Sequence, residues 1–148
     1  MNLLLDTNIV IDYLGGKPPF FDNAKRIMAA GYFGEASLWM SAKSAADAFY
    51  VLSHYVDSDR VQSALSSLYK LVHTVSLSED DLIRAAHLKW PDYEDCLIAL
   101  AAVNANASFI ITRDQKGFDR SPVPAISPDE WLDFMRQEKG FDFEMIDF

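Results

Sequence analysis

The sequence predicts an α/β fold, specifically a three-layer α/β/α sandwich around a mostly parallel central sheet. Short apolar runs of β-forming residues alternate with helical patterns along the chain, and this alternation is typical of successive βαβ units. No Gly/Ser/Pro-rich linker or internal repeat interrupts the order. We therefore expect residues 1–136 to form a single domain, followed by an acidic and aromatic tail over residues 137–148.

The first half of the chain begins with the run Leu3–Leu5, which is apolar on both faces, as in a buried parallel strand. The turn- and cap-forming residues Asp6-Thr7-Asn8 end this run. Helical spacing predicts helices over about 9–14 and 21–30, separated by glycines and prolines that break a helix. We expect a strand at 37–40 and two further helices, over about 42–54 and 57–69.

In the second half of the chain, the sequence pattern predicts a strand over 71–75 and a helix that starts at Ser78 and runs to about 88. Trp90-Pro91 ends this helix, and a nearly all-apolar one then runs from the acids at 92–95 to about 103. The run 109–112 is the clearest strand, followed by a polar loop over 113–121. The segment 123–126 contains a proline and is expected to be an edge strand, before a last helix over 128–136.

The composition is acidic, with 22 Asp and Glu against 13 Lys and Arg and a formal net charge of −9. This excess argues against broad electrostatic attraction to nucleic acid or anionic lipid. The single cysteine, Cys96, excludes a disulfide within the chain and a structural zinc site built on several cysteines. Asp6 interrupts the first apolar run, so we expect neither a signal peptide nor a membrane span, and a cytoplasmic protein.

The carboxyl edge of the predicted sheet gathers polar residues from distant parts of the chain. These are Asp6, Ser41, Asp47, Asp92, Asp95, Thr112 and Asp114. Each one follows a strand or lies in the first two turns of a helix that starts at this edge, where α/β proteins place their sites. Clustered carboxylates require a cation or protonation, and an all-oxygen donor set suits Mg²⁺ or Mn²⁺. The pattern therefore predicts a metal site suited to phosphoryl chemistry.

Three stretches, Leu3–Asp12, Asp92–Asp95 and Ile110–Asp114 with the following Gly117-Phe118, carry a family resemblance. In this order and spacing, the sequence from Leu3 to about Trp131 resembles PIN-domain ribonucleases, commonly VapC-type toxins of toxin–antitoxin pairs. The resemblance implies a PIN-like domain and a metal-dependent endoribonuclease. Carried over by position, the acidic quartet is Asp6, Asp47, Asp95 and Asp114, with Thr112 supporting the last of them and Asp92 as a neighbouring acid.

The resemblance also implies a hydrolytic mechanism. Asp6, Asp95 and Asp114 would hold Mg²⁺ or Mn²⁺, which activates a water for attack on an RNA phosphodiester. Asp47, and Asp92 as an auxiliary acid, would hold water or accept a proton. The second acid of the family is most often Glu, so the shorter Asp47 implies either a remodelled site or weaker metal binding.

Each candidate also has a purely structural interpretation, as a helix cap, a turn residue or an ion-pair partner. Asp47 can pair with Lys43 one helical turn away, and Ser41 can cap the following helix. Convergence of the whole set at one edge favours the site interpretation. Elsewhere, Asp12 is expected to face solvent, with a weak auxiliary role at most, and Cys96 to pack in the core.

The sequence is also compatible with two other functions. A haloacid-dehalogenase-like phosphatase also begins with a strand that ends in Asp, but its second Asp is replaced by Asn8, and Lys116 is a poor match for its lysine. The second is a catalytically weak PIN-fold adaptor that binds a basic protein segment. Asp47, in place of the usual Glu, is the feature that supports it.

The expected partners follow from charge and from the resemblance. RNA contact would depend on a few cations near the same edge, namely Lys43, Arg113 and Lys116, with bound metal supplying the positive charge that the composition lacks. The resemblance implies a homodimer and, for a toxin, an antitoxin that covers the site.

Overall fold

A computed structural model describes residues 1–140, so that most of the predicted tail, residues 141–148, lies outside the described residues. The described part of the chain contains five strands, seven α-helices and one 3₁₀ helix. In chain order they are β1 (Asn2–Leu5), α1 (Thr7–Gly15), α2 (Phe21–Tyr32), β2 (Ser37–Ser41), α3 (Ala42–Leu52), α4 (Ser58–Leu68), β3 (Val72–Val75), α5 (Glu79–Leu88), α6 (Tyr93–Asn104), β4 (Phe109–Ile111), η1 (Gln115–Phe118), β5 (Ala125–Ile126) and α7 (Pro128–Lys139).

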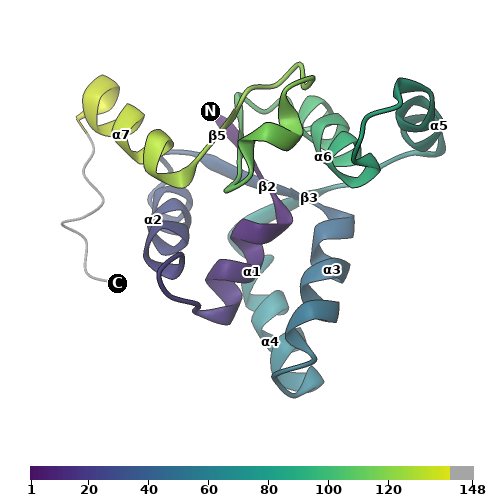
Figure 1. Cartoon of the computed structure of the whole chain (residues 1–148). Helices are drawn as coiled ribbons and strands as arrows, with labels where there is room; N and C mark the ends of the chain where they lie inside the picture. The colour runs from purple at the N-terminus through teal and green to yellow at the C-terminus, as the bar shows by residue number, and fades with distance from the viewer. Residues whose placement is uncertain (141–148) are drawn as a thin grey trace.

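The five strands form one sheet in the order β3-β2-β1-β4-β5 (Figure 1). All neighbouring strands are parallel, which confirms the predicted sheet. The central strand β1 pairs with β2 on one side and with β4 on the other, where Leu5 lies opposite Ile111. The chain segments that follow β1 and β4 therefore leave the sheet side by side.

Helices cover both faces of the sheet, which confirms the three-layer sandwich (Figure 1). Successive side chains of a strand point to opposite faces. Leu3 and Leu5 accordingly pack with α1, α2, α3, α4 and α7, whereas Leu4 packs with α6 and η1. Helix α5 lies outside α6, and Cys96 is buried between these two helices, as predicted.

The structure differs from the predicted elements in three places. The expected polar loop contains η1, strand β5 is limited to two residues after Pro124, and α7 continues to Lys139, three residues beyond the expected end. Pro124 has no N–H for a ladder, although its carbonyl accepts a hydrogen bond from Ile110 N. Within residues 1–140, no helix has the length and apolar character needed to cross a membrane.

Candidate active site

Asp6 stands directly after the central strand and is held by residues from two segments of the chain. As the cap of α1, its Oδ1 accepts the Thr7 N–H at 2.8 Å, and its Oδ2 accepts the Thr112 hydroxyl at 2.8 Å. The residue is only 9% exposed. Burial raises the pKa of the Asp6 carboxyl, against the lowering effect of the bonds from Thr112 and Thr7. The structure thus buries an acid whose charge the fold compensates only in part.

Thr112 links Asp6 to Asp114. Its hydroxyl has one proton, which it donates to Asp6, while its oxygen accepts the Asp114 N–H at 3.0 Å and an Asn8 Nδ2–H at 3.3 Å. Thr112 is fully buried. Because β1 and β4 are adjacent, a single side chain orients the acids that follow both strands.

The acids at the start of α6 are arranged by helix capping. Asp92 is the N-cap residue, and its Oδ1 accepts the Asp95 N–H at 3.1 Å. Burial raises the pKa of Asp95 to about 6, with further contributions from the charges of Asp92, Asp6 and Asp114. The elevated pKa therefore reflects burial first, and then repulsion among carboxylates from three separate segments.

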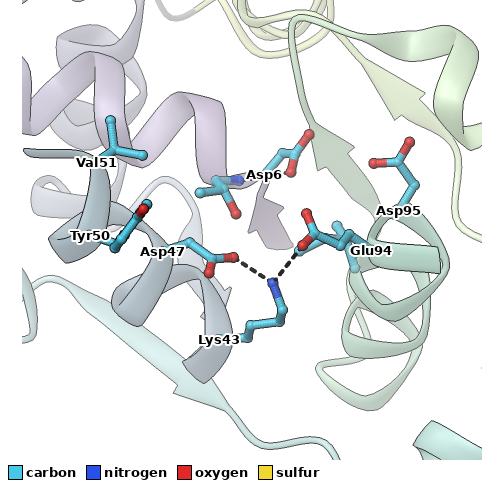
Figure 2. Close-up of a pocket in the computed structure, with 9 residues that line it drawn as sticks. Asp6, Lys43, Asp47, Tyr50, Val51, Glu94 and Asp95 are labelled. Atoms are coloured by element: carbon cyan, nitrogen blue, oxygen red, sulfur yellow. Dashed lines mark hydrogen bonds and ion pairs between the residues drawn. The ribbon is translucent and has the colours of Figure 1, made fainter. Parts of the chain in front are cut away.

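Asp6 and Asp95 line a cleft of about 340 Å³. Figure 2 shows their carboxylates pointing toward each other. The cleft is lined by Asp6, Thr7, Lys43, Asp47, Tyr50, Val51, Glu94, Asp95 and Ile98. Asp114 does not line it, although its charge acts on both Asp6 and Asp95. The structure thus brings Asp6, Asp47 and Asp95 into the cleft, whereas the Asp114 carboxylate lies outside its lining, near Gly117.

Lys43 lies between two carboxylates in this cleft (Figure 2). Its ammonium is 2.6 Å from Asp47 Oδ2 and 3.2 Å from Glu94 Oε1. Partial burial alone would lower the pKa of Lys43, but its bonds to Asp47 and Glu94 raise it above the ordinary value. The sequence interpretation missed Glu94, whose only signal was its place among the acids at 92–95. The predicted structural role of Asp47, pairing with Lys43, is confirmed.

The expectation that Asp12 faces solvent is wrong. Asp12 is 2% exposed, and its carboxylate accepts bonds from Arg113 Nε at 2.6 Å and Nη2 at 3.2 Å. The same guanidinium lies 3.9 Å from the centroid of the Phe20 ring. A local helix pattern cannot reveal this burial, because the partner comes from the segment after β4. In this arrangement Arg113 is engaged with Asp12 and Phe20.

The remaining sequence candidates, Ser41 and Lys116, do not line the cleft. Ser41 is buried and caps α3, since its Oγ accepts the Lys43 N–H at 3.2 Å. Lys116 lines a second hollow of about 270 Å³, together with Asp92 and Gly117. The cations predicted to contact RNA therefore occupy three separate places.

Gly117 is a site residue for a steric reason that sequence alone did not reveal. A Cβ built at this position overlaps Asp95 Oδ2 and lies 3.7 Å from Asp114 Oδ2. Its appearance in the motif after Asp114 was the only signal. The absent side chain leaves room for the two carboxylates.

The donor set fits a divalent cation, although within residues 1–140 no three Asp, Glu, His or Cys side chains form a preformed cage. Carboxylate oxygens are the ligands that Mg²⁺ and Mn²⁺ prefer. Asn8 Oδ1 is buried and accepts no hydrogen bond from the described residues, while its amide approaches Asp6 and Thr112. Mutual repulsion among unneutralised carboxylates favours their separation. The residues Asp6, Asp95 and Asp114 therefore suit a hard divalent ion.

Because the pKa of Asp95 is higher in the folded protein than in the unfolded chain, the stability of the fold is expected to depend on pH. The carboxyl ionises near 3.8 in the unfolded chain and at about 6 in the folded one, so the folded state binds the extra proton between these values and stability falls as pH rises. We expect Asp95→Asn to raise the Tm of the metal-free protein by about 2–4 °C near pH 7.5 and to have little effect near pH 4.

Thermal unfolding in a chelator, followed by circular dichroism, measures this difference. Glu138→Gln, which changes an exposed acid on α7, is the matched control. Equal Tm shifts for Asp95→Asn at both pH values would show that the charge of Asp95 is not the cause.

Comparisons with known proteins identify the family of this chain. Residues 2–116 match the family described as PIN domain, and no curated protein matches the chain. Similar solved structures include VapBC2 from Rickettsia felis bound to a promoter DNA fragment, which is 21% identical, with 86% of this chain and 98% of that chain covered and a TM-score of 0.65. VapBC-1 from nontypeable Haemophilus influenzae is also 21% identical, with 87% and 99% covered and a TM-score of 0.65.

A third similar structure is VapC20, a sarcin-ricin loop cleaving toxin from Mycobacterium tuberculosis. It is 11% identical, with 78% of this chain and 92% of that chain covered and a TM-score of 0.64. At these identities the structural likenesses show the shared fold, whereas the family match extends over most of the chain. The chain therefore belongs to the PIN domain family.

Proposed function

We propose that this protein is a metal-dependent endoribonuclease and the toxin component of a toxin–antitoxin pair, active in the cytoplasm. The main support is the convergence of Asp6, Asp95 and Asp114 from three segments, with Thr112 joining two of them. Membership of the PIN family supports a nuclease over the phosphatase alternative. One structural neighbour is named for cleavage of the sarcin-ricin loop.

In the proposed mechanism, Asp6, Asp95 and Asp114 hold Mg²⁺ or Mn²⁺. When bound, the ion would act as a Lewis acid that lowers the pKa of a water molecule and neutralises charge on the phosphodiester. Thr112 keeps Asp6 oriented through their 2.8 Å bond. Asp47 holds the Lys43 ammonium through Oδ2. Its other carboxylate oxygen is available to bind a water molecule or to accept a proton. The Lys43 ammonium has three donors and can turn one toward a phosphate oxygen.

Metal removal provides the direct test. Incubated with a defined RNA, the protein is expected to cleave it in Mg²⁺ or Mn²⁺, to lose about a thousandfold or more of its rate in a chelator, and to recover on readdition of the ion. Gel analysis of end-labelled RNA measures the rate. Absence of cleavage of any RNA, together with binding of a basic peptide, would instead support the adaptor function.

Tyr50 is expected to contribute to RNA binding. It lines the cleft one turn beyond Asp47, its side chain is 68% exposed, and an exposed aromatic ring is a stacking surface for a nucleobase. We expect Tyr50→Ala to raise KM about 5- to 150-fold with little change in kcat, because base stacking contributes about 1–3 kcal/mol.

Steady-state kinetics on a short single-stranded RNA measure this effect. Tyr50→Phe keeps the ring and serves as the control, so that KM values close to wild type are expected for it. A fall in kcat without a change in KM for Tyr50→Ala would contradict a stacking role.

The proposed partners are an antitoxin and a second copy of this chain. Two structural neighbours are toxin–antitoxin complexes, and the excess of carboxylates around the cleft suits a partner segment with basic side chains. A neighbouring reading frame for a small basic DNA-binding protein, whose product copurifies with this chain and blocks cleavage, would support the assignment.

A further inference from the structure

The acids of the site fall into two groups that differ in how their charge is balanced. Asp6, Asp95 and Asp114 form no ion pair with any residue in 1–140. Asp47 and Glu94, by contrast, share the ammonium of Lys43 at 2.6 and 3.2 Å (Figure 2). One side of the site thus lacks a cation, whereas the other side has one supplied by the protein.

Local helix energetics do not explain the position of Lys43. It is the second residue of α3, where the helix dipole disfavours a positive charge. A lysine placed four residues before an acid is also the weaker order for a helical ion pair. Glu94, the second partner, comes from α6, 51 residues further along the chain. The side chain is therefore held between a neighbour on its own helix, Asp47, and an acid that only the tertiary structure brings near, Glu94.

We propose that Lys43 is the built-in cation of the Asp47–Glu94 side of the site, so that the protein binds one divalent ion rather than two. This inference depends on the proposed function. A second ion at Asp47 and Glu94 would meet a tethered ammonium that competes for the same oxygens and repels the ion. The single ion accordingly belongs with Asp6, Asp95 and Asp114, and Lys43 provides a fixed positive charge for the phosphate backbone of RNA.

Titration of the full chain with Mn²⁺, by calorimetry and by electron paramagnetic resonance of the free ion, tests this inference. We expect one Mn²⁺ per wild-type chain. In Lys43→Met, we expect a second ion to bind at least about tenfold more tightly than in wild type, because a nearby positive charge is removed. Lys70→Met is the matched control, since Lys70 is exposed and lies before β3, at the opposite edge of the sheet; its stoichiometry is expected to stay at one.

The possible outcomes separate this inference from the proposed function. Two ions of similar affinity in wild type, or unchanged binding in a folded Lys43→Met protein, would overturn the role of Lys43 and leave the nuclease assignment standing. Absence of Mn²⁺ binding in wild type would overturn both. If Lys43→Met does not fold, Lys43→Gln, which keeps hydrogen-bonding groups without the charge, provides the same measurement.

Discussion

Asp6→Asn is expected to lower kcat/KM for RNA cleavage by about a thousandfold or more while the protein remains folded. Asp6 is the acid that follows the central strand, and its carboxylate accepts bonds from both Thr7 and Thr112. An amide of the same size retains one acceptor oxygen but lacks the negative charge that holds a divalent ion. The loss should therefore appear in metal affinity and in rate together.

Three measurements characterise the Asp6→Asn variant. Calorimetric titration with Mn²⁺ gives the metal affinity, and end-labelled RNA gives the cleavage rate. Melting in a chelator should show a Tm equal to or above that of wild type, because burial of the ionised Asp6 is unfavourable. Asp22→Asn, an exposed change on α2, is the charge-matched control. Wild-type cleavage by Asp6→Asn would refute the proposed metal site.

Gly117→Ala is expected to lower the cleavage rate about a hundredfold, although Gly117 carries no chemical group. Its added methyl overlaps Asp95 Oδ2, whereas it is only in ordinary contact with Asp114 Oδ2, so the Asp95 carboxylate has to move. Overpacking of this kind costs about 1–3 kcal/mol in stability. A displacement of about 1 Å at reacting groups is enough for a hundredfold loss of rate.

Gly15→Ala is the matched control for this change. It also adds one methyl group, but its Cβ meets only the flexible end of Leu52, at 3.3 Å. We expect near-wild-type cleavage for Gly15→Ala, and for Gly117→Ala a weaker Mn²⁺ affinity and a loss in kcat. If Gly117→Ala cleaves RNA as wild type does, the position of Asp95 is not critical for the reaction.

The alternating pattern of the sequence was sufficient to predict the layers, the parallel sheet and the edge that carries the acids. The prediction was possible because strand burial and helix capping are local properties: Leu3–Leu5 reads as a buried strand, and Asp6 and Asp92 cap helices as their residue types favour. In the observed topology the ends of β1 and β4 lie side by side, at the edge where α/β proteins place their sites.

The partners of the charged side chains could not be predicted in the same way. Asp12 was expected to face solvent, yet Arg113, 101 residues away, neutralises it in the interior. Neither the bridge from Lys43 to Glu94 nor the fit of Asp95 against Gly117 has a local signature. Such contacts depend on distances of a few ångströms between segments far apart in the chain.

By itself, therefore, the sequence determined the fold class, the acidic edge and the resemblance to PIN-domain ribonucleases, because hydrophobic periodicity and capping act within a few residues. Only the tertiary structure decided which carboxylates face one another, that Lys43 also pairs with Glu94 and Arg113 with Asp12, and which position tolerates no side chain. The physical reason is that electrostatic energy and steric overlap depend on distance in space rather than on separation along the chain.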